Sequence, residues 1–380
     1  MFYIILLVAI LLPLLMKEKQ IALKISFCCL FILWGLQYDM VMDWPGNMAR
    51  WYDVTSVIGD TIMVGRRTYE PAFVFLVKLS EPIGFFGWLI VCGIFDLTIF
   101  YILIKKYVPE KYYWVTIFAL MIRSDLGLLL INSNRQTLSV VFSMIGVLVL
   151  LYQNDKELLK NKLLLIIKSI IFITLVYIAS NIHSAAKIAY LLLPLYLLSH
   201  YVKRIPIIII LIINIVFFAR FFADVTSLQD WATEFLGDIS IQDSFSSYMT
   251  LIDNSRVRFS VVEQSIFFII MNGALFYYKH MNKAIKLFAL CTIIAILGKG
   301  FFVGNLSRLL QYFYIYIIVL VPYLVIYCLQ SKEKIIANIR KPLLILMCLY
   351  CIYAINRELT HEHYHKWKNF KTILSAPEWK

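Results

Sequence analysis

Residues 163–198 read LLLIIKSIIFITLVYIASNIHSAAKIAYLLLPLYLL, two apolar runs joined by one short polar break. The first run, 163–179, approaches the length that a helix needs to cross a hydrocarbon layer about 30 Å thick. The pattern recurs along the chain, in which 61% of residues are hydrophobic and 16% are charged. Soluble domains carry roughly a quarter charged residues. The sequence therefore predicts an all-α polytopic membrane protein.

About twelve apolar segments are candidate membrane spans, and we expect one integral membrane domain over residues 1–380. The segments are 1–16, 21–37, 84–104, 112–131, 135–152, 163–180, 184–200, 206–222, 259–278, 284–301, 308–329 and 341–356. The stretch 69–82 is apolar but too short to cross, and prolines near both its ends favour an interfacial or re-entrant helix. The N-terminus lacks a basic region before its apolar run, so we interpret it as the first span rather than a signal peptide.

Lysine sets the predicted orientation. Most lysines fall in one alternate set of short loops, which the positive-inside rule assigns to the cytoplasm. That set is 17–24, 105–111, 153–162, 201–205, 279–286 and 331–341. Both termini are then extracytoplasmic, together with the long loops 38–70 and 223–258 and the tail 357–380. The net charge of +13 has its cause in this bias, and we expect no nucleic-acid partner.

Arginine follows a different pattern, because most arginines lie on or near the predicted outer face. A guanidinium fork matches phosphate and carboxylate oxygens two at a time, so an anionic ligand at that face is one interpretation. Snorkelling to lipid headgroups and pairing with acids in the same loops is the other. The outer arginines are Arg50, Arg66, Arg67, Arg123, Arg135, Arg220, Arg256, Arg258, Arg308 and Arg357.

Polar residues gather at three predicted outer helix ends. Asn132, Asn134, Arg135 and Gln136 open one span, Asn181, His183 and Ser184 join two others, and Asn305, Ser307, Arg308 and Gln311 open a third. Polar side chains at membrane depth tend to line a cavity or a substrate path. Arg135 and Arg308 each begin a helix, where free N–H groups favour an anion such as pyrophosphate.

His183 is a candidate general base for a hydroxyl nucleophile, and a helix-capping histidine is the alternative. The tail motif HEHYHK (361–366) lacks the spacing of zinc hydrolases. Asp39 and Asp43 are four residues apart and form no close metal-binding pair. The seven cysteines lie in predicted spans without zinc spacing. We therefore expect no metal site and no cofactor.

Four stretches occur in order along the spans: GRRTYEPAFVFLVKL (65–79), NSNRQTLSVVF (132–142), NIHSAAK (181–187) and NLSRLLQYFYI (305–315). Together they resemble the EpsG-type, Wzy-like polymerases of bacterial envelope polysaccharides. The resemblance implies a GT-C-like membrane glycosyltransferase of the lineage shared with O-antigen ligases. It further implies that oligosaccharide repeat units on undecaprenyl pyrophosphate are joined, without metal, at the outer leaflet of the inner membrane. Lipopolysaccharide O-antigen, capsule and exopolysaccharide all remain open as products.

The resemblance and the residues suggest specific roles. Arg135 and Arg308 would hold the lipid pyrophosphate, with His183 as base and Glu70 as sugar-positioning group or alternative base. Second choices for the phosphate or sugar are Arg66, Arg67, Arg123, Arg256, Arg258, Asn134, Asn305, Asp39 and Asp43. Membrane lipid and a separate chain-length regulator are further expected partners.

An O-antigen ligase and a lipid-linked oligosaccharide flippase are the alternatives. A flippase needs charge through the full membrane depth and commonly has repeated halves. In this sequence the charge concentrates near one face, and no repeated halves are visible.

Overall fold

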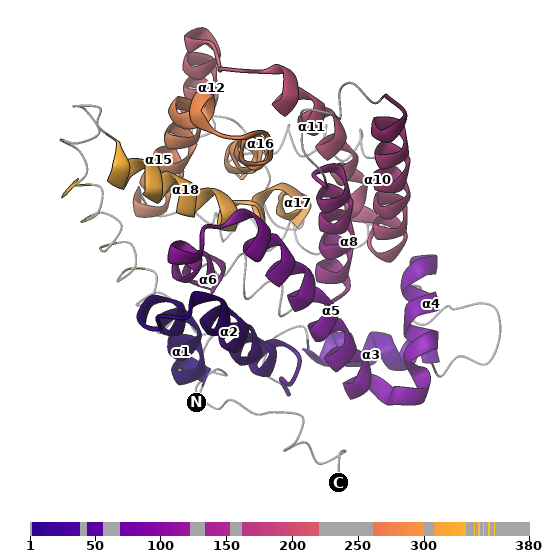
Figure 1. Cartoon of the computed structure of the whole chain (residues 1–380). Coiled ribbons are helices and arrows are strands. Elements are labelled where there is room, and N and C mark those ends of the chain that lie inside the picture. The colour runs from indigo at the N-terminus through magenta and orange to yellow at the C-terminus, as the bar shows by residue number, and fades with distance from the viewer. Residues whose placement is uncertain are drawn as a thin grey trace. The chain divides into compact units, whose positions relative to one another are not determined.

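The computed structural model describes residues 2–38, 44–55, 69–121, 134–152, 162–219, 261–299 and 308–331, and the single positions 338, 341, 342, 345, 349 and 353. These ranges form helices joined by turns, so the predicted all-helical fold is confirmed (Figure 1). The chain divides into two compact units, Met1–Lys187 with Val321–Lys380, and Ile188–Leu320. Each unit is described by itself. The single membrane domain stays a prediction.

The first unit holds the helices that carry most of the predicted site. They are α1 (Phe2–Leu15), α2 (Lys19–Trp34), α3 (Trp44–Thr55), α4 (Pro71–Ser80), α5 (Gly84–Tyr107), α6 (Tyr113–Met121), α8 (Asn134–Leu150) and α10 (Lys162–Ile182). The second unit contains α11 (Leu192–Tyr201), α12 (Ile207–Ala219), α15 (Val261–Tyr277), α16 (Lys283–Gly298) and α17 (Gln311–Tyr314). A 3₁₀ turn, Ser184–Leu191, and α18 (Ile317–Gln330) cross the boundaries between the units.

Helices occur in every predicted span up to residue 329, and 341–356 lies mostly outside the described residues. Two described helical stretches, Pro71–Tyr107 and Lys162–Ile182, are long and apolar enough to cross a membrane. Arg308–Tyr314 and Ile317–Gln330 would make a third as one span with a 46° bend. The full set of about twelve spans and the GT-C lineage stay predictions.

A glycine separates α4 from α5. Gly84 has a φ of +68°, a left-handed conformation that costs an L-residue roughly 1–2 kcal/mol. The chain therefore changes direction after α4, which is the ten-residue helix expected within 69–82. Its predicted interfacial or re-entrant placement stays a prediction.

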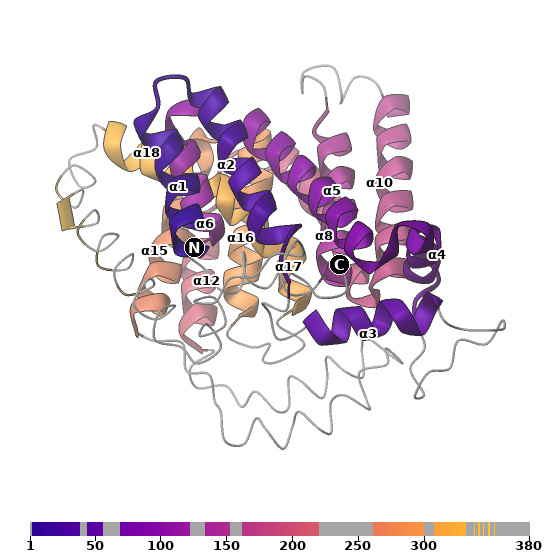
Figure 2. The ribbon, with the colours of Figure 1, turned by 90° about the horizontal axis from the view of Figure 1, so that it is seen from below.

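Helices α8 and α10 lie side by side in both views (Figures 1 and 2). They run antiparallel, because Ser139 near the start of α8 donates a 2.9 Å hydrogen bond to the carbonyl of Ala179 near the end of α10. Gly146 provides the close approach, since a Cβ there would lie 2.9 Å from the Phe172 ring. The packing brings the beginning of α8 to the end of α10, where the predicted site residues lie.

Two buried lysines cap the carboxyl ends of neighbouring helices. Lys168 of α10 is 4% exposed, and its ammonium donates to the carbonyls of Leu150 and Tyr152 at the end of α8. In the second unit Lys286 donates to the carbonyls of Val202 and Lys203, at 3.2 and 3.1 Å, after α11. Terminal carbonyls have no partner within their own helix, and a cation also suits the negative end of the helix dipole. Some lysines therefore have a structural role besides any effect on topology.

Helices α2 and α5 approach at a pair of glycines. A Cβ at Gly93 would lie 2.8 Å from the Cα of Gly35, which is backbone and cannot rotate away. We expect Gly93→Leu to lower the free energy of unfolding by about 1–3 kcal/mol through overpacking. The melting temperature of the detergent-purified protein measures this. Val91→Leu, at a position 50% exposed on the same helix, is the matched control. An unchanged melting temperature for Gly93→Leu would contradict this packing.

Candidate functional site

Five predicted site residues fall in the described part of the chain. Glu70, Asn134, Arg135 and His183 belong to the first unit, and Arg308 belongs to the second. The other predicted site residues lie outside the described residues, and their roles stay predictions: Asp39, Asp43, Arg66, Arg67, Arg123, Arg256, Arg258 and Asn305.

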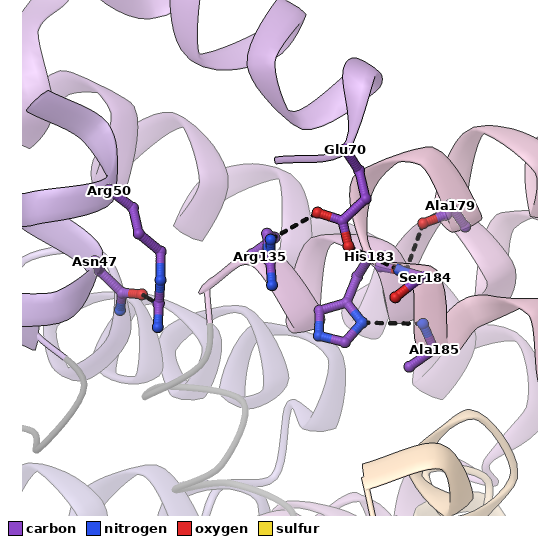
Figure 3. A network of polar contacts seen from close by, with 9 residues as sticks. Asn47, Arg50, Glu70, Arg135, Ala179, His183, Ser184 and Ala185 are labelled. Carbon is purple, nitrogen blue, oxygen red and sulfur yellow. Dashed lines mark hydrogen bonds and ion pairs between the residues drawn. The ribbon is translucent and has the colours of Figure 1, made fainter. Parts of the chain in front are cut away.

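Glu70 is the centre of a polar network in the first unit (Figure 3). It precedes Pro71, the first residue of α4, and its extended backbone is that of an N-cap. Its carboxylate does not cap its own helix. Instead, Oε2 accepts from Nη1 of Arg135 at 2.6 Å and Oε1 accepts from the backbone N–H of Ser184 at 3.1 Å. One side chain thus joins the start of α4, the start of α8 and the turn after α10.

The guanidinium of Arg135 is held in place by its neighbours, and among the described residues only part of its hydrogen-bonding capacity is used. Its side chain is 24% exposed, and its guanidinium carbon lies 5.6 Å from the centre of the Phe73 ring. A guanidinium has five N–H donors. Among the residues that the structure describes, the side chain of Arg135 donates one hydrogen bond, to Glu70. The remaining donors can take an anionic oxygen while the carboxylate and the ring fix the orientation of the fork.

His183 occupies the turn between α10 and the 3₁₀ segment (Figure 3). Its backbone N–H donates to Ala179 at 2.9 Å, and its ring Nδ1 accepts from the backbone N–H of Ala185 at 3.2 Å. In a neutral imidazole one nitrogen accepts and the other carries the proton. This arrangement therefore assigns the proton to Nε2, which makes that nitrogen a hydrogen-bond donor and not a proton acceptor.

A second layer of contacts supports the network. Ser139 and the backbone N–H of His183 share the carbonyl of Ala179, which ties α8 to the histidine turn. Tyr69 directly precedes Glu70 in the sequence, and its hydroxyl donates to Asp53 of α3 at 3.1 Å. Sequence reasoning missed these contacts. The position of Tyr69 directly before Glu70 in the sequence could have indicated its contact with Asp53. A hydrogen bond from a backbone N–H, such as that of Ser184, does not depend on the side chain and cannot be predicted from the residue type.

Arg50 and Asn134 have other surroundings. Arg50 of α3 donates to the side-chain oxygen of Asn47 one turn earlier, at 3.0 Å (Figure 3), and its role in binding an anion or pairing with an acid stays a prediction. The side-chain oxygen of Asn134 is buried and accepts no hydrogen bond from the residues that the structure describes. Direct contact of Asn134 with substrate stays a prediction.

The second unit also contains charged residues beside or between its helices. The ammonium of Lys299, 7% exposed, lies 3.6 Å from the centre of the Tyr314 ring and 5.5 Å from that of Phe267. Glu263, one turn before Phe267 on α15, is 4% exposed. Arg308 opens the turn that leads into α17. Sequence reasoning identified Arg308 but neither Lys299 nor Glu263.

Metal ligation receives no support from the described ranges, where no group of three or more His, Cys, Asp or Glu side chains could hold an ion. The HEHYHK motif lies outside them.

The apolar helices and the charged network at three helix ends define a helical membrane protein with a polar site. The chain belongs to the EpsG family, which it matches over residues 20–372. The resemblance drawn from the four sequence stretches is thereby confirmed. No curated protein and no solved structure matches the sequence.

Proposed function

We propose that the protein is a polysaccharide polymerase of the bacterial inner membrane. It would join oligosaccharide repeat units carried on undecaprenyl pyrophosphate at the outer leaflet, by glycosyl transfer without a metal or cofactor. Membership of the EpsG family supports a polymerase. The observation that carries the proposal at the level of residues is the Arg135–Glu70 pair, which leaves guanidinium donors for a phosphate.

In the proposed reaction, the acceptor sugar hydroxyl attacks the anomeric carbon of the donor chain. The new C–O bond forms as the bond from that carbon to the pyrophosphate oxygen breaks. The hydroxyl proton passes to the carboxylate of Glu70, and the lipid pyrophosphate leaves with the bonding electron pair. Arg135 and the Nε2–H of His183 stabilise the negative charge on that leaving group, as preorganised donors do in other enzymes.

Glu70 is preferred to His183 as the base on geometric grounds. A general base must offer a lone pair to the proton that it removes. The Nδ1 lone pair of His183 already accepts from Ala185, whereas each carboxylate oxygen of Glu70 has lone pairs beyond its single bond. Arg308, in the other unit, stays a separate predicted phosphate ligand.

An O-antigen ligase and a flippase are the remaining alternatives, and purified components separate them. Protein reconstituted in vesicles with purified lipid-linked repeat unit is expected to form dimers and longer chains, visible as a ladder on a gel. A ligase would need a separate lipid acceptor to form product, and a flippase would form no new glycosidic bond. Absence of any elongated product from correctly inserted protein would overturn the proposal. Heat-inactivated protein is the control for non-enzymatic product.

A further inference from the structure

Helix α3 lies beside α4, the helix that Glu70 precedes, in both views (Figures 1 and 2). Trp51 anchors this contact. Its side chain is 6% exposed, and its indole N–H donates to the hydroxyl of Ser80 at the end of α4, at 3.0 Å. Val54, on the same side of α3, is 1% exposed. One buried face therefore sets the orientation of α3 against α4.

Asp53 is a carboxylate on a different side of α3. It follows Trp51 by two residues, which on a helix turns a side chain by about 200°, and it is partly exposed. Its Oδ2 atom accepts from the hydroxyl of Tyr69 at 3.1 Å, and among the residues that the structure describes it accepts this one hydrogen bond. A carboxylate has about four lone-pair sites on two oxygens. Asp53 therefore keeps acceptor capacity for a ligand while Tyr69 limits its rotation.

The bond from Tyr69 connects Asp53 to the proposed catalytic network. Tyr69 directly precedes Glu70 in the sequence, and its ring lies 6.0 Å from the ring of Phe73, which is 5% exposed. The guanidinium carbon of Arg135 lies 5.6 Å from the centre of the same ring, and Arg135 donates to Glu70 at 2.6 Å. Tyr69 and Arg135 thus lie against one buried ring, and Asp53 extends the network onto α3.

The chemistry of this extension suits a sugar hydroxyl. In the proposed reaction Glu70 takes the proton of the attacking hydroxyl, and Arg135 holds the pyrophosphate of the donor. The acceptor is an oligosaccharide, so it carries further hydroxyls beyond the one that attacks. A carboxylate accepts hydrogen bonds from hydroxyls but is repelled by a phosphate. Asp53 is therefore suited to the acceptor sugar and not to the lipid pyrophosphate.

We propose that Asp53 binds the acceptor sugar. Its carboxylate accepts a hydrogen bond from a hydroxyl other than the attacking one, and Tyr69 holds the carboxylate in the orientation for this bond. Asp53 thereby helps to select the acceptor, because a site built to hydrogen-bond a hydroxyl rejects analogues that lack it. The identity of the ligand as an acceptor rests on the proposed polymerase function.

Binding of a free acceptor tests this role without turnover. Mild acid releases the oligosaccharide repeat unit from its lipid pyrophosphate, and the released oligosaccharide can serve as acceptor but not as donor. Calorimetric titration of the detergent-purified protein with it gives Kd. We expect Asp53→Ala to raise Kd at least about tenfold, the effect of losing a hydrogen bond to a charged group. No binding by wild type, or an equal Kd for wild type and Asp53→Ala, would overturn the proposal.

Thr55→Ala is the matched control on α3. The hydroxyl of Thr55 donates to the carbonyl of Trp51 in its own helix at 3.0 Å, so its loss should leave Kd unchanged. A rise in Kd for Thr55→Ala as large as that for Asp53→Ala would indicate a general disturbance of α3 and overturn the assignment to Asp53.

Two further variants separate sugar binding from a structural link. Asp53→Asn is nearly isosteric and keeps an oxygen that can accept from Tyr69, but it loses the charge that strengthens the bond to a hydroxyl, so Kd should rise several-fold. Tyr69→Phe removes the link and keeps the carboxylate, so Kd should rise less than in Asp53→Ala. A normal Kd for Asp53→Asn, with Tyr69→Phe as impaired as Asp53→Ala, would show that the pair only joins α3 to the network. The Asp53→Asn comparison stands even if Asp53→Ala fails to fold.

The elongation assay on the same preparations separates this proposal from the proposed function. If wild type binds the oligosaccharide through Asp53 but forms no elongated product, the sugar site stands and the polymerase function fails. If wild type elongates and Asp53→Ala binds and elongates normally, the polymerase function stands and the sugar site fails.

Discussion

Replacement of Glu70 by glutamine is expected to lower the elongation rate by about 10²–10⁴-fold, the range found when a general acid or base is removed. Glutamine keeps the length of the side chain and an oxygen that can accept from Arg135, as Glu70 does at 2.6 Å. It cannot take a proton from the acceptor hydroxyl. Product formed per unit time from lipid-linked repeat unit, at matched amounts of inserted protein, measures the effect.

Glu81→Gln is the matched control for this substitution. Glu81 is exposed and lies in the turn directly after α4, outside the network, so its loss should leave elongation unchanged. Glu70→Asp keeps a proton acceptor on a shorter side chain and should retain part of the activity. A near-normal rate for Glu70→Gln would instead exclude Glu70 as the base and leave His183 or Asp43 to be tested.

The second role of Glu70, holding Arg135, can be separated by kinetics. Arg135→Lys keeps the positive charge but loses the planar fork that matches phosphate oxygens. Its main effect is expected on KM for the lipid-linked donor, whereas loss of the base in Glu70→Gln should lower kcat with KM little changed. Equal effects of both variants on both constants would indicate that Glu70 acts only by positioning Arg135.

The sequence predicted the helices well because burial of long apolar runs dominates their placement. The start of α8 at Asn134 and the end of α10 at Ile182 lie within two residues of the predicted limits. The break at Gly84 depends on a single positive φ angle, which hydrophobicity does not encode. The short helix α4 was nevertheless anticipated, because Pro71 suits a first helical position.

The candidate site was predictable as a set of residues but not as a network. Glu70, Arg135 and His183 stood out as polar residues at helix ends. Their pairing depends on how three distant segments pack, and no local pattern specifies that.

Replacement of His183 by alanine is expected to lower elongation by about 10²–10³-fold, the cost typical of one lost donor to a developing oxyanion. The ring accepts from Ala185 at Nδ1, which assigns its proton to Nε2 and directs its action to the leaving pyrophosphate. The reconstituted elongation assay measures the loss. Ser184→Ala is the matched control, because Ser184 contacts Glu70 through its backbone N–H and that bond survives the substitution.

Two amide substitutions distinguish the roles open to His183. Glutamine can place an N–H near the position of Nε2, whereas asparagine can place an oxygen near Nδ1 and accept from Ala185 as the ring does. If His183 donates to the leaving group, His183→Gln should recover activity lost in His183→Ala, and His183→Asn should not. If His183 only caps the helix end, the reverse is expected. If neither amide restores elongation while the protein inserts normally, a proton must be accepted at this position, and His183 rather than Glu70 is the base.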